Sequence, residues 1–168
     1  MKKILETERL ILRQFELTDA KFIVELVNTP GWIEFIGDRN IRADDAAIHY
    51  LQNGPIKSYR ENGFGLSMVE LKDGTPIGMC GILRRDTLES PDIGFSFLPE
   101  FMGRGYAFEM ADATLNYAKT KLNLELILAI TVPTNKKSIR LLEKIGLQFK
   151  QTIYTTGKNE ELMLFSTK

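Results

Sequence analysis

The stretch Leu98-Pro99-Glu100-Phe101-Met102-Gly103-Arg104-Gly105-Tyr106-Ala107 joins a segment of strand character to a long helical one. Asp92 to Leu98 predict the strand, which ends at the proline, and Gly105 to Leu122 place small and apolar side chains at helical spacing. Two glycines separated by one residue let backbone N–H groups converge on one point. The helix N-terminus adds free N–H groups and a partial positive charge, so this loop suits an anion such as a pyrophosphate.

A Gly-x-Gly motif taken alone is weak evidence, because a plain strand-to-helix turn also uses glycine to relieve strain. The chain has neither Gly-x-x-x-x-Gly-Lys-Ser/Thr nor the third glycine of Gly-x-Gly-x-x-Gly. If the loop does hold a phosphate, Arg104 is expected to add positive charge at its rim. Tyr106 is expected to pack beside the loop.

Outward from this loop, alternation and helical spacing predict an α+β fold in a single domain over residues 1–168. A helix capped by Thr18 or Asp19 ends before Pro30-Gly31, and a short helix or loop follows at 32–37. Gly54-Pro55 divides a helical stretch at 43–60. The remaining helices are expected at 105–122 and 138–145, and the strands at 9–15, 64–71, 75–85, 92–98, 124–131, 149–155 and 161–166.

Composition narrows the class of function. The 22 Lys and Arg residues balance the 22 Asp and Glu residues, which argues against a nucleic-acid partner. Cys80 is the one cysteine and His49 the one histidine, so a disulfide and a His/Cys metal site are not expected; His49 reads as a solvated residue on a surface helix. No apolar run has the length of a membrane span, and the first residues lack an apolar signal core, so a cytoplasmic protein without a membrane partner is expected.

The loop resembles the acyl-CoA loop of the GNAT N-acetyltransferases, Gln/Arg-x-x-Gly-x-Gly/Ala, with Met102, Gly105 and Ala107 at its defined positions. Met102 departs from Gln/Arg. Three further stretches resemble the branch that acetylates ribosomal-protein N-termini: residues 8–13 with Asp19-Ala20, residues 92–95, and Asn135-Lys136-Lys137-Ser138 followed by residues 141–147.

This resemblance implies the GNAT fold, a mixed and mostly antiparallel central sheet flanked by helices. It also implies transfer of an acetyl group from acetyl-CoA to a primary amine, without a metal. The main-chain amides of Met102, Gly103, Arg104, Gly105, Tyr106 and Ala107 would hold the pyrophosphate. Pantetheine would lie along the edge of the strand Asp92–Leu98, where a bulge is expected to splay the strand.

Acetyl transfer needs a base for the amine, an N–H donor for the oxyanion and a proton for the thiolate. The resemblance places the oxyanion donor at the backbone of Phe97 or Leu98. Asp92 is the candidate base, with Glu89, Glu100 or a water-mediated base as alternatives. Asp92 would otherwise be only a solvated residue that begins the strand.

Many GNAT enzymes carry a tyrosine acid at the position that Leu142 occupies here. The resemblance to the ribosomal-protein branch instead implies a serine three residues after Asn135, so Ser138 is the candidate acid. The resemblance also implies that Asn135 bonds pantetheine or orients the site. Both residues equally suit the start of a helix, with Asn135 as the N-cap. Leu142 leaves open a non-catalytic acyl-CoA-binding or sensory domain.

Acceptor choice is expected to lie within residues 29–42 and 154–161. Trp32, Phe35 and Tyr154 are candidates to line a groove, and Glu34, Asp38, Glu160 and Glu161 to attract a cation; core and surface roles are equally open for them. The branch resemblance favours a protein N-terminal α-amine, and a small-molecule enzyme acting on aminoglycosides or polyamines is the alternative. A homodimer is also possible for this fold.

Overall fold

The structure is a computed structural model that describes residues 2–168 and confirms the predicted α+β class. Its strands are β1 (Lys3–Glu6), β2 (Leu10–Arg13), β3 (Leu66–Leu71), β4 (Pro76–Leu83), β5 (Asp92–Phe97), β6 (Leu128–Thr131), β7 (Gln148–Tyr154) and β8 (Glu161–Ser166). Its α-helices are α1 (Ala20–Val27), α2 (Pro30–Phe35), α3 (Asp44–Asn53), α4 (Pro55–Asn62), α5 (Tyr106–Thr120) and α6 (Lys136–Lys144). Two short 3-10 turns, Leu17–Asp19 and Pro99–Phe101, complete the elements.

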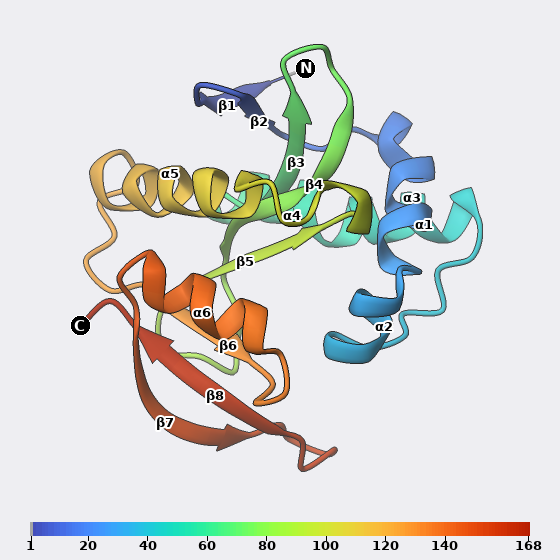
Figure 1. The fold of residues 1–168 in the computed structure, drawn as a ribbon. Helices are drawn as coiled ribbons and strands as arrows, with labels where there is room; N and C mark the ends of the chain where they lie inside the picture. The colour runs from blue at the N-terminus through green and yellow to red at the C-terminus, as the bar shows by residue number, and fades with distance from the viewer. Residues whose placement is uncertain (1) are drawn as a thin grey trace.

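All eight strands form one mixed and mostly antiparallel sheet in the order β1-β2-β3-β4-β5-β6-β8-β7. Strands β1 to β5 pair antiparallel in sequence order, and β6, β8 and β7 form a second antiparallel set. Figure 1 shows the two sets, with β1 to β5 in the upper half and β6 to β8 below α6. Within residues 2–168 one pairing is parallel, that of β5 with β6, and it joins the two sets.

Helices cover both faces of the sheet. Successive side chains of a strand point to opposite faces. On β4, Met79 packs with α1 and α3, whereas Ile82 packs with α5 and Leu142 of α6. Cys80 also faces α5, where its thiol lies 3.4 Å from the Thr114 hydroxyl. Burial raises the pKa of this thiol to about 12, so Cys80 is a core residue rather than a nucleophile.

The sheet parts between β5 and β6. Only one residue pair, Asp92 with Leu128, joins these strands, supported by a hydrogen bond from the Leu128 N–H to the Pro91 carbonyl. The β4–β5 register, in contrast, runs from Gly78–Phe97 to Leu83–Asp92 without a shift. The expected bulge is therefore absent from this pairing, and the opening arises because β6 diverges from β5. Beyond Asp92, one edge of β5 faces a gap.

The observed elements differ from the predicted ones mainly at the N-terminal strands, at α2 and after α5. Helix α2 begins at Pro30, two residues before the expected element, because proline suits the first turn of a helix. The expected strand at 9–15 is shorter and pairs with β1, which was not predicted because Lys3–Glu6 is a short edge strand with charged ends. Residues 124–127 of the expected strand at 124–131 instead close the turn after α5, where the Leu124 N–H bonds the Ala118 carbonyl. The division at Gly54-Pro55 and the Asn135 cap are confirmed. Within residues 2–168, no helix combines the length and the apolar character needed to cross a membrane.

Candidate active site

The glycine loop has the backbone geometry of an anion site. Gly103 and Gly105 adopt φ angles of +78° and +82°, in the left-handed region that favours glycine. Gly105 is the N-cap of α5, and the first intrahelical bond runs from the Glu109 N–H to the Gly105 carbonyl at 3.0 Å. The N–H groups that precede Glu109 therefore have no partner within the helix and point out of its N-terminus. The loop is exposed, so these donors are available to a ligand.

A contact that sequence analysis missed ties this loop to the N-terminal strands. Arg9, just before β2, donates its Nε–H to Glu109 of α5 at 2.7 Å and an Nη1–H to the Arg104 carbonyl at 3.0 Å. Thr7 donates its hydroxyl to the same Glu109 carboxylate at 2.6 Å. Partial burial acts to raise the pKa of Glu109, but these hydrogen bonds prevail and lower it. Glu109 is therefore a structural anion that holds the start of α5.

The side chains of Tyr106 and Arg104, at the start of α5 and in the loop, pack against neighbouring groups. Arg9 lies 4.5 Å from the Tyr106 ring centroid, and Phe101 packs against the same ring, which confirms the expected packing of Tyr106. The Arg104 guanidinium lies 5.8 Å from the centroid of Phe101. Arg9 lies in the stretch 8–13 that resembles the family, so the sequence marks this residue as notable. Nothing in the sequence indicates that its side chain bonds Glu109.

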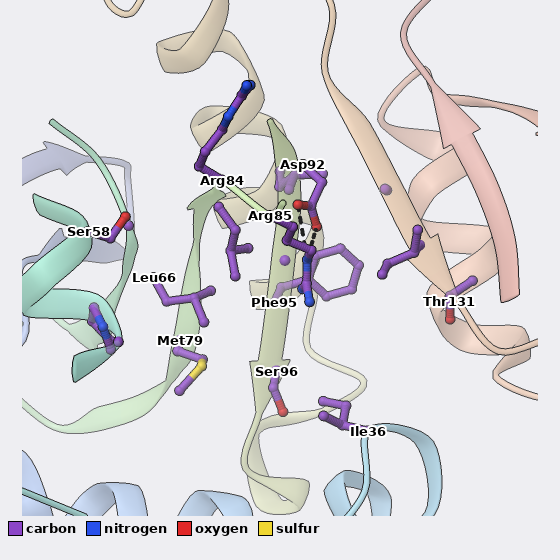
Figure 2. A pocket seen from close by; sticks show the side chains of 18 of the residues that line it. Ile36, Ser58, Leu66, Met79, Arg84, Arg85, Asp92, Phe95, Ser96 and Thr131 are labelled. Carbon is purple, nitrogen blue, oxygen red and sulfur yellow. Dashed lines mark hydrogen bonds and ion pairs between the residues drawn. The ribbon is translucent and has the colours of Figure 1, made fainter. Parts of the chain in front are cut away.

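A cavity of about 690 Å³ opens where β5 and β6 part. Its wall brings together Asp92 and Ser96 of β5, Thr131 of β6, and Asn135, Ser138 and Leu142 at α6. Figure 2 shows Asp92 and Ser96 along β5 and Thr131 on the neighbouring strand. The loop 102–107, Phe97 and Leu98 lie outside this wall. The structure therefore gathers the expected catalytic residues in one place and leaves the expected pyrophosphate site at the far end of β5.

Only one of the two expected oxyanion donors keeps a free N–H. The Leu98 N–H donates to the Ile77 carbonyl at 2.9 Å and is thus committed to the β4 side. Backbone groups alternate between the two edges of a strand, and the β4–β5 register is continuous. The N–H groups of Phe97 and Phe95 therefore point to the opposite edge, where β6 has diverged.

Asp92 is buried, with 1% of its surface exposed, at the closed end of the gap. Arg85, in the loop before β5, directs its Nε–H at both carboxylate oxygens, each 3.1 Å away (Figure 2). Burial raises the pKa of Asp92 above its ordinary value, and the Arg85 charge acts in the opposite direction. Glu89 and Glu100, the alternative bases, are exposed and do not line the cavity.

Asn135 and Ser138 are positioned by the first turn of α6. The Asn135 side chain accepts a hydrogen bond from the Ser138 N–H at 3.3 Å, so it caps the helix and also faces the cavity. The Ser138 hydroxyl has no hydrogen-bond partner recorded within residues 2–168. Leu142, one turn later, is 1% exposed and supplies an apolar wall.

The residues that were expected to bind the acceptor fall into two groups, those that line the cavity and those that do not. Trp32, Phe35 and Glu160 line the cavity, whereas Glu34, Tyr154 and Glu161 do not. Asp38 pairs with Arg42 at 2.6 Å and is unavailable to a cation. The cavity is also lined by three residues that the sequence did not single out, Arg39, Tyr50 and Arg85. They come from three separate segments, and no motif links these segments. Among residues 2–168, no three His, Cys, Asp or Glu side chains form a group that could hold a metal ion.

Comparisons with known proteins agree with this arrangement. The chain is 29% identical to the uncharacterized N-acetyltransferase YoaA of Bacillus subtilis (strain 168), a similarity that covers 99% of this chain and 97% of that protein. It is 27% identical to the spermidine N(1)-acetyltransferase of Vibrio cholerae serotype O1, over 82% of this chain and 78% of that one.

Among solved structures, the fold matches RimL, a ribosomal L7/L12 α-N-protein acetyltransferase in complex with coenzyme A. The TM-score is 0.84 at 12% identity, over 98% of this chain and 97% of that one. Residues 9–148, which include the glycine loop, β5, β6 and α6, match the family described as the Acetyltransferase (GNAT) domain. Because that match spans most of the chain and contains the site, this protein belongs to the GNAT acetyltransferase family.

Proposed function

We propose that this protein transfers the acetyl group of acetyl-CoA to a primary amine, with the N-terminal α-amine of a polypeptide as acceptor and all 168 residues acting as one domain. The observation that carries the proposal is the course of β5. The strand runs from Asp92, in the cavity, towards the glycine loop that opens α5, and one edge is free along the way. An elongated thioester fits such a track, with its phosphates at one end and its acyl group at the other.

The chain would hold the co-substrate mainly through its backbone. The N–H groups at residues 103–107, at the start of α5, would bind the pyrophosphate. The expected contact from the Met102 N–H is not available, because this group donates to the Pro99 carbonyl at 3.1 Å. The free edge at Phe95 and Phe97 would pair with the pantetheine amides as an added strand would. Asn135, which faces the cavity from the α6 side, would bond the pantetheine arm near its end.

Asp92, a free-edge N–H of β5 and Ser138 would share the chemistry. Asp92 takes the proton that the acceptor ammonium must lose, and its burial makes it a stronger base than an ordinary aspartate. The amine nitrogen then bonds the acetyl carbon while the Phe95 N–H, on the free edge of β5 and in the cavity wall, stabilises the oxyanion. Phe97 lies about 16 Å along the strand from Asp92, too far to serve the same acetyl group. When the C–S bond breaks, Ser138 gives its proton to the thiolate. The nitrogen releases its second proton to solvent as the amide forms, and Ser138 regains a proton from solvent.

The resemblance to the ribosomal-protein branch and the RimL fold support an α-amine acceptor. The similarity to a spermidine acetyltransferase supports a second candidate, a polyamine acceptor. Leu142 in the cavity wall is the observation that favours a binding domain without chemistry.

The test is the release of free CoA from acetyl-CoA with a panel of peptides, polyamines and aminoglycosides, in wild type and in Asp92→Asn. We expect a peptide amine to stimulate release, Asp92→Asn to lower it by about 10²-fold or more, and a chelator to leave it unchanged. Stimulation by polyamines alone would select the second candidate. CoA binding without amine-stimulated release would identify a binding domain.

A further inference from the structure

One corner of the cavity presents hydrogen-bond donors that have no acceptor. The donors come from α2, α3, the loop between them and the loop before β5, and they belong to Trp32, Tyr50, Arg39 and Arg85, all of which line the cavity. The corner is the part of the wall around Tyr50, on which the charges of Arg39 and Arg85 both act. The indole Nε1–H of Trp32 is buried and unpartnered. The Arg39 guanidinium and the Tyr50 hydroxyl likewise have no hydrogen-bond acceptor or ion-pair partner recorded within residues 2–168.

Arg85 contributes only part of its hydrogen-bonding capacity to Asp92. Its Nε–H is the group that bonds the carboxylate, so both Nη atoms, with four N–H bonds, keep no recorded partner. The side chain is 38% exposed, whereas Asp92 is 1% exposed. Arg85 therefore buries one nitrogen against the candidate base and leaves its outer fork to the cavity (Figure 2).

The acidic residues of the cavity do not neutralise this corner. Asp92 is engaged by Arg85, and Glu61 lies 3.9 Å from Lys57. Asp86 and Glu160 line the cavity from the β4–β5 loop and the β7–β8 hairpin. Burial raises the pKa of Tyr50, and the charges that act on it are those of Arg39 and Arg85, both of which lower it. Two guanidinium charges therefore act on the Tyr50 hydroxyl, and both favour an anion beside it.

We propose that the acceptor carries a carboxylate besides its primary amine, and that Arg39, the outer fork of Arg85 and the Tyr50 hydroxyl bind this carboxylate. Two guanidinium groups and a hydroxyl supply the donors that a carboxylate accepts, and the amine then lies next to Asp92. The inference rests on the proposed function and narrows its substrate class. The carboxylate can be the α-carboxylate of a free amino acid or an acidic side chain near the start of a peptide.

The positive corner also has a consequence for the amine. A nearby guanidinium disfavours a second positive charge and so favours loss of the ammonium proton, which must precede attack. The same repulsion opposes a further ammonium group placed beside Arg39 and Arg85, where a carboxylate would instead be attracted. We therefore expect spermidine to be a poor acceptor relative to a carboxylate-bearing amine.

The experiment uses matched acceptors that differ only in the carboxylate. One pair is an amino acid and its amide, and the other is two peptide amides with glutamate or glutamine at the second position. We expect the carboxylate member of at least one pair to have about tenfold higher kcat/KM, mostly through KM. The pair that discriminates identifies the source of the carboxylate.

Arg39→Gln keeps a polar side chain and removes the charge, so it should reduce the preference to about threefold or less. Arg85→Gln should do the same, whereas Arg39→Lys should restore part of it. Arg84→Gln is the matched control, because Arg84 also lines the cavity but does not act on Tyr50, and it should keep the full preference. Calorimetry of the same acceptors with the CoA-loaded protein measures carboxylate binding independently of turnover.

Equal turnover and equal binding of both members in both pairs would overturn the inference while leaving the acetyltransferase proposal intact. A preference that survives Arg39→Gln and Arg85→Gln would also overturn it, since the carboxylate would then bind elsewhere. If no amine stimulates CoA release, the proposed function fails, and the calorimetry still decides whether this corner binds a carboxylate.

Discussion

Gly105 is the residue whose backbone most directly shapes the proposed pyrophosphate site. It holds a φ of +82° at the start of α5, and a Cβ added there would lie 3.3 Å from a guanidinium nitrogen of Arg9. Gly105→Val should weaken CoA binding by about tenfold or more, because a β-branched side chain resists this backbone conformation and occupies the space above the helix N-terminus.

Gly74→Val is the matched control for this substitution. Gly74 has a φ of +90° in the β3–β4 turn, and an added Cβ there meets nothing within 4 Å. Both variants carry comparable backbone strain, but only one of them touches the loop. Calorimetry that finds equal CoA affinity in the two folded variants would exclude the loop as the pyrophosphate site.

Ser138 has a structural and a chemical role that one substitution separates. Its N–H receives the Asn135 cap, while its hydroxyl has no recorded partner in residues 2–168. Ser138→Ala keeps the capping N–H and removes only the hydroxyl. It should lower kcat by about 10²-fold or less, because CoA thiolate is already a good leaving group, and leave the Kd for acetyl-CoA nearly unchanged.

Asn135→Ala is the contrasting variant, since it removes the cap and should cost about 1 kcal/mol of stability. If Ser138→Ala instead weakens CoA binding and spares kcat, Ser138 is a cofactor contact. If neither quantity changes, the residue only begins the helix.

Asp92 predicts a pH dependence with a defined sign. A base must be deprotonated, so kcat/KM should fall as the pH drops through the pKa of Asp92, which burial raises above its ordinary value. The Arg85 charge lowers that pKa, so Arg85→Gln should move the acid limb to higher pH. A neutral amide acceptor keeps carboxylate binding out of the measurement, and Arg84→Gln serves as the control. Superimposable profiles for wild type and Arg85→Gln would argue against Asp92 as the base.

At the scale of elements, the hydrogen bonds of Arg9 connect the N-terminal strands to the start of α5. Arg9 bonds Glu109 and the Arg104 carbonyl, so it joins the β1–β2 turn to the loop it flanks. Its side chain is 43% exposed, and exposed ion pairs contribute only about 0–1 kcal/mol to stability. Arg9→Gln should therefore change the melting temperature little but raise the Kd for CoA about fivefold, because the loop loses its support.

Lys72→Gln is the control for this tie, since it removes an exposed ion pair with Glu6 on the same part of the sheet without contacting the loop. Equal CoA affinity in Arg9→Gln and Lys72→Gln would show that the loop holds its shape without Arg9.

At the scale of the whole molecule, the sequence predicts local structure better than long-range contacts. The glycine loop, the Gly54-Pro55 division and the Asn135 cap have signals within a few residues, and each was correctly placed. The stretches that resemble the family led us to expect Asp92 and Ser138 in one active site, and in the structure both residues line the same cavity.

Contacts made across the fold were beyond reach from the sequence. Arg9 and Glu109 are 100 positions apart, and neither residue alone indicates a partner. The parting of β5 from β6 depends on how two halves of the sheet diverge, which the alternation within a strand does not encode. For the same reason the donor-rich corner at Arg39, Tyr50 and Arg85 became visible only once three segments had been placed together.

The gap between the two halves of the sheet yields a prediction about the whole molecule. If pantetheine adds to the free edge of β5, the amides of Phe95 and Phe97 should exchange with solvent about tenfold more slowly with saturating CoA, since they gain hydrogen-bond acceptors. The Ser96 amide is an internal control, because the β4–β5 register directs it at β4 in either state. Hydrogen exchange followed residue by residue by NMR makes the measurement, with the wild-type protein without CoA as the unliganded comparison. Slower exchange in the loop 105–107 with no change at Phe97 would show that CoA binds at the helix terminus without lying along β5. The catalytic roles of Phe95, Asp92 and Ser138 would then have to be reassigned together, because all three depend on the thioester reaching the closed end of the gap.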